Sequence, residues 1–448
     1  MLLEFKVANF KSIKDVQVFS MIRGSKEKAL ENNFATITLD KIGKSSKEID
    51  VLKTSAIYGA NASGKSNLIE AIFTIRNIII TSHQNQQGDL LPIEPFKLDE
   101  TYRSLPSYFE FTFIQESIKY LYFVKLNKHI IEEENLYFYP RGRKQGVFLR
   151  KGNKIEINFG STKLDEMDKV RQQIYAEDIA DNILFLSLAN RIKIDAVKNA
   201  FKWFLQKLVV IPPNQRLLST TTPMLNDHII DENMVLKYLQ VADPLISKVS
   251  IELEEKLDNN PLMAQMRQHM LSHLSDRMSP NVIQEMIKQN KFSVLKEKFM
   301  RYGKNKAGEL IPVEFTIEEE SIGTQKYYSL IGPLVSALRN GNVLICDELD
   351  TSMHPLLMQS ILELFTSDQN KSNAQLIIST HNVYFLDKHN LFRKDQIWLT
   401  EKSISGETTL YSINDFNNTR REDLSSKTYL KGKFGAIPSV NMWEIFDV

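Results

Sequence analysis

"YGANASGKSN", residues 58–67, holds two glycines, a lysine and a serine at the spacing G-x-x-x-x-G-K-S. The preceding run "VLKTSAIYG" predicts a strand, and apolar residues at helical spacing after Lys65 predict a helix. A glycine-rich turn between a strand and a helix offers backbone N–H groups and the positive end of the helix to an anion. The stretch therefore predicts a loop that wraps the phosphates of a nucleotide.

Two side chains of this loop have chemistry of their own. Lys65 supplies a point charge for the β- and γ-phosphates, and the Ser66 hydroxyl can ligate Mg²⁺. The expected nucleotide-binding residues are Gly59, Ala60, Asn61, Ala62, Ser63, Gly64, Lys65, Ser66 and Asn67. A pattern this short recurs by chance, so its meaning depends on what else the chain supplies.

A second segment, "NVLICDELD" at residues 342–350, is an apolar run that ends in adjacent carboxylates. The run suits a buried parallel strand, and its carboxyl end can face the phosphate loop. We expect Asp347 to hold Mg²⁺ through water and Glu348 to orient and polarise the attacking water. For these carboxylates taken alone, a solvated strand end is the alternative.

Two more segments complete the set. "IISTHN", residues 377–382, is an apolar strand followed by His381, which can reach the γ-phosphate and the catalytic water. "ESIGTQK", residues 320–326, precedes a predicted helix and forms a second anion site, which we assign to the nucleotide of a second subunit. Its expected contact residues are Ser321, Gly323, Thr324 and Gln325. For His381 the alternative is a simple surface histidine, and for Ser321–Gln325 it is a plain helix cap.

Composition bounds the class of protein. Of 448 residues, 42% are hydrophobic and 25% charged, and a net charge of +1 creates no global attraction to nucleic acid or acidic membranes. The single cysteine, Cys346, excludes an intrachain disulfide framework and fits a reducing cytosol. The first residues lack the apolar core of a signal peptide, and no apolar run approaches the ~20 residues that span a bilayer. We therefore expect a cytoplasmic protein without membrane contact.

The hydrophobic pattern changes along the chain. Closely spaced strands between residues 107 and 160 predict an antiparallel meander. From about residue 163, helical patterns follow, including residues 195–211 and a block at 232–301. The last third alternates strand and helix, with helices expected at 326–339 and 355–366, as parallel sheets require.

These patterns predict an α/β fold with a mixed sheet, an antiparallel β patch and a helical insertion. The expected domains are 1–162, 163–301 and 302–448, and the insertion splits the nucleotide domain. The phosphate loop lies in the first part, and the two carboxylates and His381 lie in the last part with a C-terminal tail.

Taken in order, the motifs resemble the ABC-type ATPases of the chromosome-maintenance and RecF group. Their order is Walker A, insertion, signature, Walker B, D-loop and switch histidine, and the resemblance covers roughly residues 1–75 and 310–385. It implies a split ABC-type ATPase head, ATP and Mg²⁺ as cofactors, and a head-to-head homodimer or higher oligomer.

More narrowly, the chain is similar to the OLD-like and AbiL-like AAA-family ATPases of bacterial phage defence and abortive infection. Besides "ESIGTQK", the strings that support this are "NFKSI" at 9–13, "PFKLD" at 95–99, "DELDTSMHP" at 347–355 and "YLKGKFGAIP" at 429–438. The resemblance implies that Lys11 lies close to the nucleotide.

Some positions depart from the family pattern. The signature is normally L-S-G-G-Q, and here Gln325 follows Ser-Ile-Gly-Thr. In the D-loop, Asp350 is present, but His354 stands where an aspartate is expected. These departures suggest slow turnover. The Q-loop glutamine stays open among Gln87, Gln115 and Gln145.

Other side chains favour plain structural roles. His269 and His273 lie four residues apart on a predicted helix and could share a metal, but a solvated face is favoured because no carboxylate or cysteine accompanies them. Cys346, Trp203 and Phe204 are expected in the core. One basic cluster could contact a phosphate backbone, although a charged hairpin tip is favoured: Arg141, Arg143, Lys144, Arg150 and Lys151.

The resemblance implies an ATP-gated dimer that opens on hydrolysis and controls a separately encoded effector, a nuclease or toxin, in antiviral defence. DNA or a phage component could be a further partner. Two alternatives remain: a DNA-repair or recombination ATPase of the RecF kind, and a scaffold whose ATP is structural. We expect the helical insertion and the tail from Asn417 to face the partner. The tail's basic residues with Tyr429 and Phe434 suit an exposed strip that docks on a partner or nucleic acid, and a solvated tail that packs its own two aromatics is the alternative.

Overall fold

The computed structural model describes residues 1–25, 27–39, 48–158, 166–189, 191–211, 220–257, 291–416 and 419–438. The chain divides into two compact units. The first unit comprises Met1–Gln215 with Pro333–Val448, and the second comprises Arg216–Gly332. The domain boundaries at 162 and 301 rest on the sequence pattern and stay a prediction.

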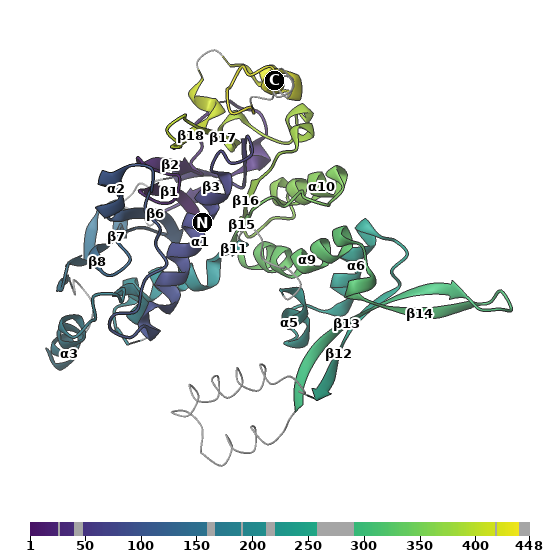
Figure 1. Cartoon of the computed structure of the whole chain (residues 1–448), viewed down its shortest axis with the longest axis horizontal. Coiled ribbons are helices and arrows are strands. Elements are labelled where there is room, and N and C mark those ends of the chain that lie inside the picture. The colour runs from purple at the N-terminus through teal and green to yellow at the C-terminus, as the bar shows by residue number, and fades with distance from the viewer. Residues whose placement is uncertain are drawn as a thin grey trace, which may run out of the picture. The chain divides into compact units, whose positions relative to one another are not determined.

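A six-stranded sheet in the first unit positions the predicted motifs (Figure 1). Its strands are β5 (Thr54–Gly59), β11 (Leu208–Ile211), β15 (Val343–Cys346), β16 (Gln375–Ser379), β17 (Ile397–Lys402) and β18 (Thr408–Ser412). The order is β11-β15-β16-β5-β17-β18, and all neighbours are parallel except the hairpin β17–β18. Strands from both ends of the chain therefore share one sheet, and the expected α/β fold with a mixed sheet is confirmed.

The predicted helices beside this sheet are confirmed. α1 (Lys65–Thr81) follows β5, and it buries the apolar positions Leu68, Ile72, Ile75 and Ile79, which recur at helical spacing. α9 (Ile322–Asn340) precedes β15, and α10 (Pro355–Thr366) connects β15 to β16. Proline is well tolerated at the first position of a helix, which suits the start of α10.

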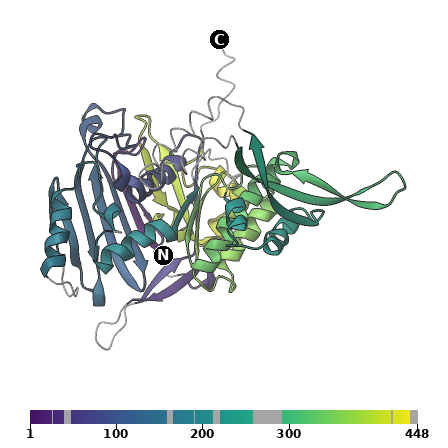
Figure 2. The same ribbon diagram turned by 90° about the horizontal axis from the view of Figure 1, so that it is seen from below.

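A seven-stranded antiparallel sheet also belongs to the first unit, and Figure 2 shows its strands side by side in blue and purple. Its strands are β1 (Leu2–Ala8), β2 (Gln17–Ser20), β6 (Ser107–Gln115), β7 (Ile118–Leu126), β8 (Ile131–Phe138), β9 (Gln145–Lys151) and β10 (Lys154–Ile157). The order β10-β9-β8-β7-β6-β1-β2 confirms the predicted meander. A separate pair is formed by β3 (Phe34–Thr38) and β4 (Glu48–Leu52).

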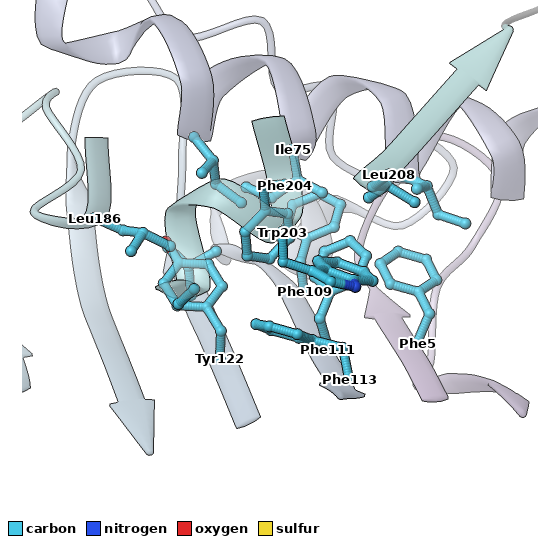
Figure 3. Packing of buried hydrophobic residues seen from close by; sticks show 14 of the residues in the cluster. Phe5, Ile75, Phe109, Phe111, Phe113, Tyr122, Leu186, Trp203, Phe204 and Leu208 are labelled. Atoms are coloured by element: carbon cyan, nitrogen blue, oxygen red, sulfur yellow. The ribbon is translucent and has the colours of Figure 1, made fainter. Parts of the chain in front are cut away.

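Aromatic side chains fill the core on one face of the antiparallel sheet (Figure 3). Trp203 stacks on Phe113 with ring centroids 4.2 Å apart, and Phe204 packs edge-on against Phe111. Trp203, Phe204 and Cys346 are buried, as the sequence predicted. The rings of Trp203 and Phe204 come from a π-helical turn, Trp203–Lys207, which continues α4 (Asp195–Lys202).

The prediction of one helix over residues 195–211 is wrong at its end. Residues Leu208–Ile211 form β11, a parallel neighbour of β15. A short apolar run of this kind fits a buried strand or a buried helix equally well by periodicity alone. The helical pattern expected from about residue 163 is also shorter in the structure. α3 ends at Glu177, and a 3₁₀ turn, Leu186–Leu188, follows.

The second unit is built on a three-stranded antiparallel sheet (green in Figure 1). Its strands are β12 (Lys248–Leu257), β13 (Lys291–Lys304) and β14 (Leu310–Thr316), and its helices include α5 (Thr221–Asn226) and α6 (Glu232–Ala242). The predicted helical block at 232–301 is therefore wrong at 248–257 and 291–301. Val249 and Phe299 face each other across β12 and β13 and are buried, so cross-strand packing decides the structure.

Short elements complete the described chain. They include α2 (Glu100–Ser104), α3 (Glu166–Glu177), the 3₁₀ helix η8 (Val383–Asp387) and α11 (Ser426–Leu430). Within the described residues, no helix is both long and apolar enough to cross a bilayer. His269 and His273 lie outside the described residues.

The prediction that the tail from Asn417 is an exposed strip is wrong for the apolar side chains of its described part, residues 419–438, whereas its basic residues Arg420, Lys427, Lys431 and Lys433 are exposed. Leu424, Tyr429, Phe434 and Ala436 are all buried, with exposed fractions of 2–6%. Phe434 packs edge-on against Phe416, with ring centroids 5.5 Å apart. Removing apolar surface from water stabilises the folded chain, so these side chains pack into the core.

Candidate nucleotide site

The phosphate loop closes around its own lysine. Lys65 is the first residue of α1, and its Nζ donates to Gly59 O at 2.9 Å and to Ala60 O at 3.0 Å. An ammonium has three N–H donors, so these two bonds leave one for an incoming phosphate. No side chain caps this end of α1, and its first backbone N–H groups are free to serve an anion.

Two threonines of the β17–β18 hairpin fix the loop from behind. The hydroxyls of Ser63 and Thr400 share a hydrogen bond of 2.6 Å, and Thr408 Oγ1 donates to Ser63 O at 2.9 Å. A Cβ on Gly59 would overlap Thr400, and one on Gly64 would overlap Thr408. Gly64 also has a φ of 111°, a conformation that favours glycine. Both glycines are therefore required by close packing.

Sequence reasoning missed both threonines. Thr400 ends the apolar run "IWLT", and neither it nor Thr408 belongs to a motif. The only signal was the apolar run itself, which indicates a strand but not its neighbours.

The two predicted carboxylates lie at the carboxyl edge of the same sheet. Asp347 and Glu348 follow β15, which is separated from β5 only by β16. Ser379, the last residue of β16, donates to Asp347 Oδ1 and accepts a hydrogen bond of 2.8 Å from Glu348 N. Ser379 is fully buried and was also missed, although it stands two residues before the predicted histidine.

His381 lies beside Glu348. Its Nε2 is 3.7 Å from Glu348 Oε1, and both side chains are partly exposed, at 41% and 48%. Glu348 has a φ of 44°, which is uncommon for a residue other than glycine. The structure thus brings together the base and the histidine that the sequence proposed separately.

Electrostatic coupling places Lys65 within range of these groups. Burial lowers the pKa of Lys65, while the charges of Glu348, Asp347 and Asp350 oppose that shift. Burial and the nearby Lys65 charge also lower the pKa of His381, against the opposing effect of the same carboxylates. A lowered pKa keeps the imidazole of His381 largely neutral near pH 7. Neutral imidazole can donate from one ring nitrogen and accept at the other.

The donor set fits a magnesium ion that is shared with phosphate. Asp347 Oδ2 is buried and has no hydrogen-bond partner, because Ser379 occupies only the other oxygen. Ser66 stands in the first turn of α1 and offers a hydroxyl. Mg²⁺ prefers oxygen ligands and commonly uses one or two protein groups together with substrate phosphates.

The expected D-loop is tied to the strand that ends at the histidine. Thr380 Oγ1 donates to Asp350 Oδ2 at 2.7 Å and accepts a hydrogen bond of 2.9 Å from Asn382 N. His354 caps α10, because its Nδ1 accepts a hydrogen bond of 3.2 Å from Leu356 N. A capping role explains a histidine here in structural terms. Any contact of Asp350 or His354 with a second subunit stays a prediction.

Lys11 lies beside α1 but is already paired. Its Nζ forms an ion pair with Glu70 of α1, and its φ of 51° belongs to the tight turn that follows β1. One residue on, Ser12 accepts a hydrogen bond of 2.5 Å from Asn67 Nδ2. The turn therefore contacts the first turns of α1, and a direct contact of Lys11 with nucleotide stays a prediction.

The candidate signature forms the start of α9 in the second unit. Ser321 Oγ accepts a hydrogen bond of 3.1 Å from Thr324 N, so Ser321 acts as the helix cap. Gln325 Nε2 donates to Glu320 O at 2.9 Å. Ser321 and its neighbour Ile322 are exposed. This geometry agrees with the plain cap, and it leaves the contact with a second subunit's nucleotide as a prediction.

The basic cluster loses one member. Arg150 has a side chain that is 0% exposed and donates to the backbone oxygens of Gly152 and Ile183. It cannot contact a phosphate backbone, so that candidate role of Arg150 is wrong. Lys144 lies over the ring of Tyr137, 3.9 Å from its centroid, at the other end of the hairpin.

The chain belongs to a known family. Residues 55–387 match the family described as "AAA domain, putative AbiEii toxin, Type IV TA system", which covers more than half of the chain. No curated protein matches the sequence.

Solved structures with some similarity are SMC head domains. One, titled as an SmcHead bound to the C-winged helix domain of ScpA, has 12% identity and a TM-score of 0.37 and covers 92% of this chain and 97% of its own. The SMC head domain from Thermotoga maritima has 11% identity and a TM-score of 0.32, covering 92% and 98%. A Pyrococcus furiosus Smc head has 12% identity and a TM-score of 0.32, covering 92% and 96%. These low scores support no further conclusion.

Proposed function

We propose that this chain binds ATP with Mg²⁺ and hydrolyses it slowly, in the manner of an ABC-type ATPase. One observation carries the proposal. Lys65, Asp347, Glu348 and His381 stand at the carboxyl ends of neighbouring parallel strands, and an oxygen of Asp347 is buried without a partner. In open α/β sheets, ligands bind at this edge of the strands. Membership of an AAA-domain family supports the same conclusion.

Each residue has a role in this proposal. The loop N–H groups and Lys65 hold and orient the β- and γ-phosphates. Ser66 and Asp347 would hold Mg²⁺, which supplies charge neutralisation at the phosphate oxygens. Glu348 accepts a proton from the attacking water, and neutral His381 donates a hydrogen bond towards the γ-phosphate. Ser379 keeps the two carboxylates in register.

We further propose that two copies share each ATP, with the start of α9 of one copy covering the phosphates held by the other. The support is an exposed helix start with a capping serine, because a helix N-terminus favours anions. The cellular role that we propose is regulation of a separately encoded effector in phage defence, since the family's description names an AbiEii toxin and a type IV toxin–antitoxin system.

The decisive test combines binding with complementation. Lys65→Ala should weaken ATP binding by about 100-fold or more, as loss of a preorganised charge does elsewhere. Lys371→Ala, at an exposed turn of the same unit, is the control and should bind normally. Calorimetry that finds unchanged affinity in Lys65→Ala would reject the phosphate loop.

Complementation tests the shared site. Ser321→Arg should bind ATP but not hydrolyse it, because a bulky cation would block the partner's γ-phosphate. A mixture of Ser321→Arg with Lys65→Ala should regain hydrolysis through one intact composite site. If the mixture does not hydrolyse ATP although both variants are folded and dimeric, the sites are not shared or both sites must function.

For the cellular role, the neighbouring reading frame should be expressed together with the wild-type chain and with Lys65→Ala. Protection from phage should require an intact phosphate loop. Equal protection by both forms would contradict control by ATP.

A further inference from the structure

The last described segment, residues 419–438, packs against the strand that leads into the phosphate loop. Tyr429 of α11 has its ring centroid 5.9 Å from that of Tyr58. Tyr58 immediately precedes Gly59 and is 1% exposed. The ring of Tyr429 therefore packs against the side chain of the residue that immediately precedes the phosphate loop.

Tyr58 also supports the residues that follow the histidine. Its Oη donates to Asn382 O at 3.3 Å, and Asn382 is the next residue after His381. Burial raises the pKa of Tyr58, so the hydroxyl keeps its proton and remains a donor. Asn382 in turn caps η8, because its Oδ1 accepts a hydrogen bond of 3.0 Å from Tyr384 N.

The far end of η8 is held by the same C-terminal segment. Ser426 N, at the start of α11, donates to Asp387 Oδ1 at 2.8 Å. Residues 380–387 are thus supported at their beginning by Tyr58, which Tyr429 covers, and at their end by α11. Other contacts also hold this connection: Thr380 N donates to Ile57 O at 3.0 Å, and Tyr384 Oη donates to Gln359 Oε1 at 3.4 Å.

The C-terminal segment depends on the core for its order. Helices much shorter than ~12 residues do not form alone in water, and α11 has 5. Tyr429 Oη donates to Ala436 O, and Tyr411 Oη donates to Phe434 O, each at 2.9 Å. The segment can therefore be in place or displaced as one piece.

We propose that residues 419–438 position His381, and that Tyr58 is the positioning residue that transmits their packing to the histidine. When Tyr429 covers Tyr58, the hydroxyl of Tyr58 fixes the backbone beside His381 and sets the imidazole next to Glu348. Displacing residues 419–438 loosens residues 380–387 and slows hydrolysis without changing the phosphate loop. This inference rests on the proposed function, because it assumes that His381 acts on ATP.

The first test removes single hydroxyl groups. Tyr58→Phe keeps the ring and loses the hydrogen bond to Asn382 O, so kcat should fall roughly three- to tenfold, the size of one hydrogen bond. The dissociation constant for ATP should change less than about twofold, since Lys65 and the loop are untouched. Tyr102→Phe also loses one hydroxyl bond, to Asp15 Oδ1, which lies outside both the C-terminal segment and residues 380–387. It should keep the kcat of the wild type.

A double-mutant cycle separates positioning from general loosening. In a His381→Ala background, Tyr58→Phe should have no further effect on kcat, because the group that it positions is gone. An equal fall in both backgrounds would overturn the proposal.

The second test does not depend on ATP hydrolysis. Hydrogen–deuterium exchange of the full chain should show faster exchange of amides in residues 380–387 for Tyr58→Phe and Tyr429→Ala, but not for Tyr102→Phe. Exchange in β5 and α1 should be unchanged, which also shows that the variants fold. Unchanged exchange in residues 380–387 would overturn the proposal even if the wild type proved inactive, and inactivity alone would reject only the proposed function.

Discussion

Two carboxylates of the first unit differ in how their oxygens are satisfied: Glu134 is fully buried, whereas Asp347 is half-buried. Glu134, in the antiparallel sheet, accepts hydrogen bonds from Tyr122 Oη at 3.0 Å, Phe185 N at 2.7 Å and Leu186 N at 2.9 Å. Arg150 Nη1 lies 3.7 Å from Glu134 Oε2. Asp347, at the edge of the parallel sheet, has one oxygen held by Ser379 and one buried oxygen without a partner.

The difference teaches how a structural acid can be told from a functional one. A buried charge is stable only when its hydrogen bonds are satisfied, and Glu134 meets that condition within the chain. Its partners Phe185 and Leu186 fix the segment 183–186 over the sheet, so its role is to hold the core together. Asp347 leaves an acceptor open at the place where a cation would complete it. An unsatisfied buried group calls for an explanation, and binding of an ion is one of several. Glu320 Oε1 is in the same state, so the place of Asp347 at the ends of the parallel strands is what supports a metal role.

The largest expected effect lies at the parallel edge. Glu348→Gln keeps the size of the side chain but removes the basic carboxylate, so hydrolysis should fall by about 100- to 10,000-fold while ATP binding and thermal stability persist. The measurements are phosphate release, calorimetry and a melting curve, with Glu363→Gln on the exposed side of α10 as control. Hydrolysis within twofold of the wild type would place the base elsewhere, with His381 the next candidate.

The antiparallel sheet should respond in the opposite sense. Glu134→Ala leaves the buried guanidinium of Arg150 without its counter-charge, which should cost about 3–5 kcal/mol of the free energy of unfolding. Glu133→Ala is the matched control, because its exposed pair with Lys125 should contribute less than about 1 kcal/mol. Urea denaturation measures both. If the two variants lose equal stability, saturation of hydrogen bonds does not distinguish the two kinds of acid.

The smallest expected effect tests the open oxygen itself. Asp347→Asn removes the charge of a half-buried side chain that has one buried oxygen without a partner, so stability should stay within about 1 kcal/mol of the wild type. The Mg²⁺ concentration for half-maximal hydrolysis should nevertheless rise by about 10- to 100-fold, as it does when groups around a metal are altered. A loss of stability with an unchanged Mg²⁺ requirement would make Asp347 a structural residue like Glu134.

Sequence reasoning succeeded where a motif fixes both residue type and backbone. The turn between β5 and α1, the strand before Asp347 and helices α1, α9 and α10 follow from short-range patterns that the structure confirms. It failed where long-range pairing decides. β11 is a strand because β15 lies beside it, and β12 and β13 are strands because they pack on each other. No local pattern contains that information.

The same limit applies to the site. Thr400, Thr408 and Ser379 hold the predicted residues in place, but a single hydroxyl in an apolar run gives no sign of its partner. The tail was misjudged for the same reason. Its basic residues suggested an exposed strip, whereas its two aromatics are packed, Phe434 on the nearby Phe416 and Tyr429 on Tyr58, which is distant in sequence.

The hydrogen bond between Ser63 and Thr400 has a consequence for the chain during its synthesis. Its two residues are 337 positions apart in the sequence. β5 pairs with β16 and β17, which begin at residues 375 and 397. At about 5–20 residues per second, the phosphate loop waits roughly 20–70 seconds on the ribosome before its supporting hairpin emerges. A nascent chain therefore exposes the loop motif long before its supporting hairpin is present, and the ATP binding that we propose should become possible only after β18, Thr408–Ser412, has emerged.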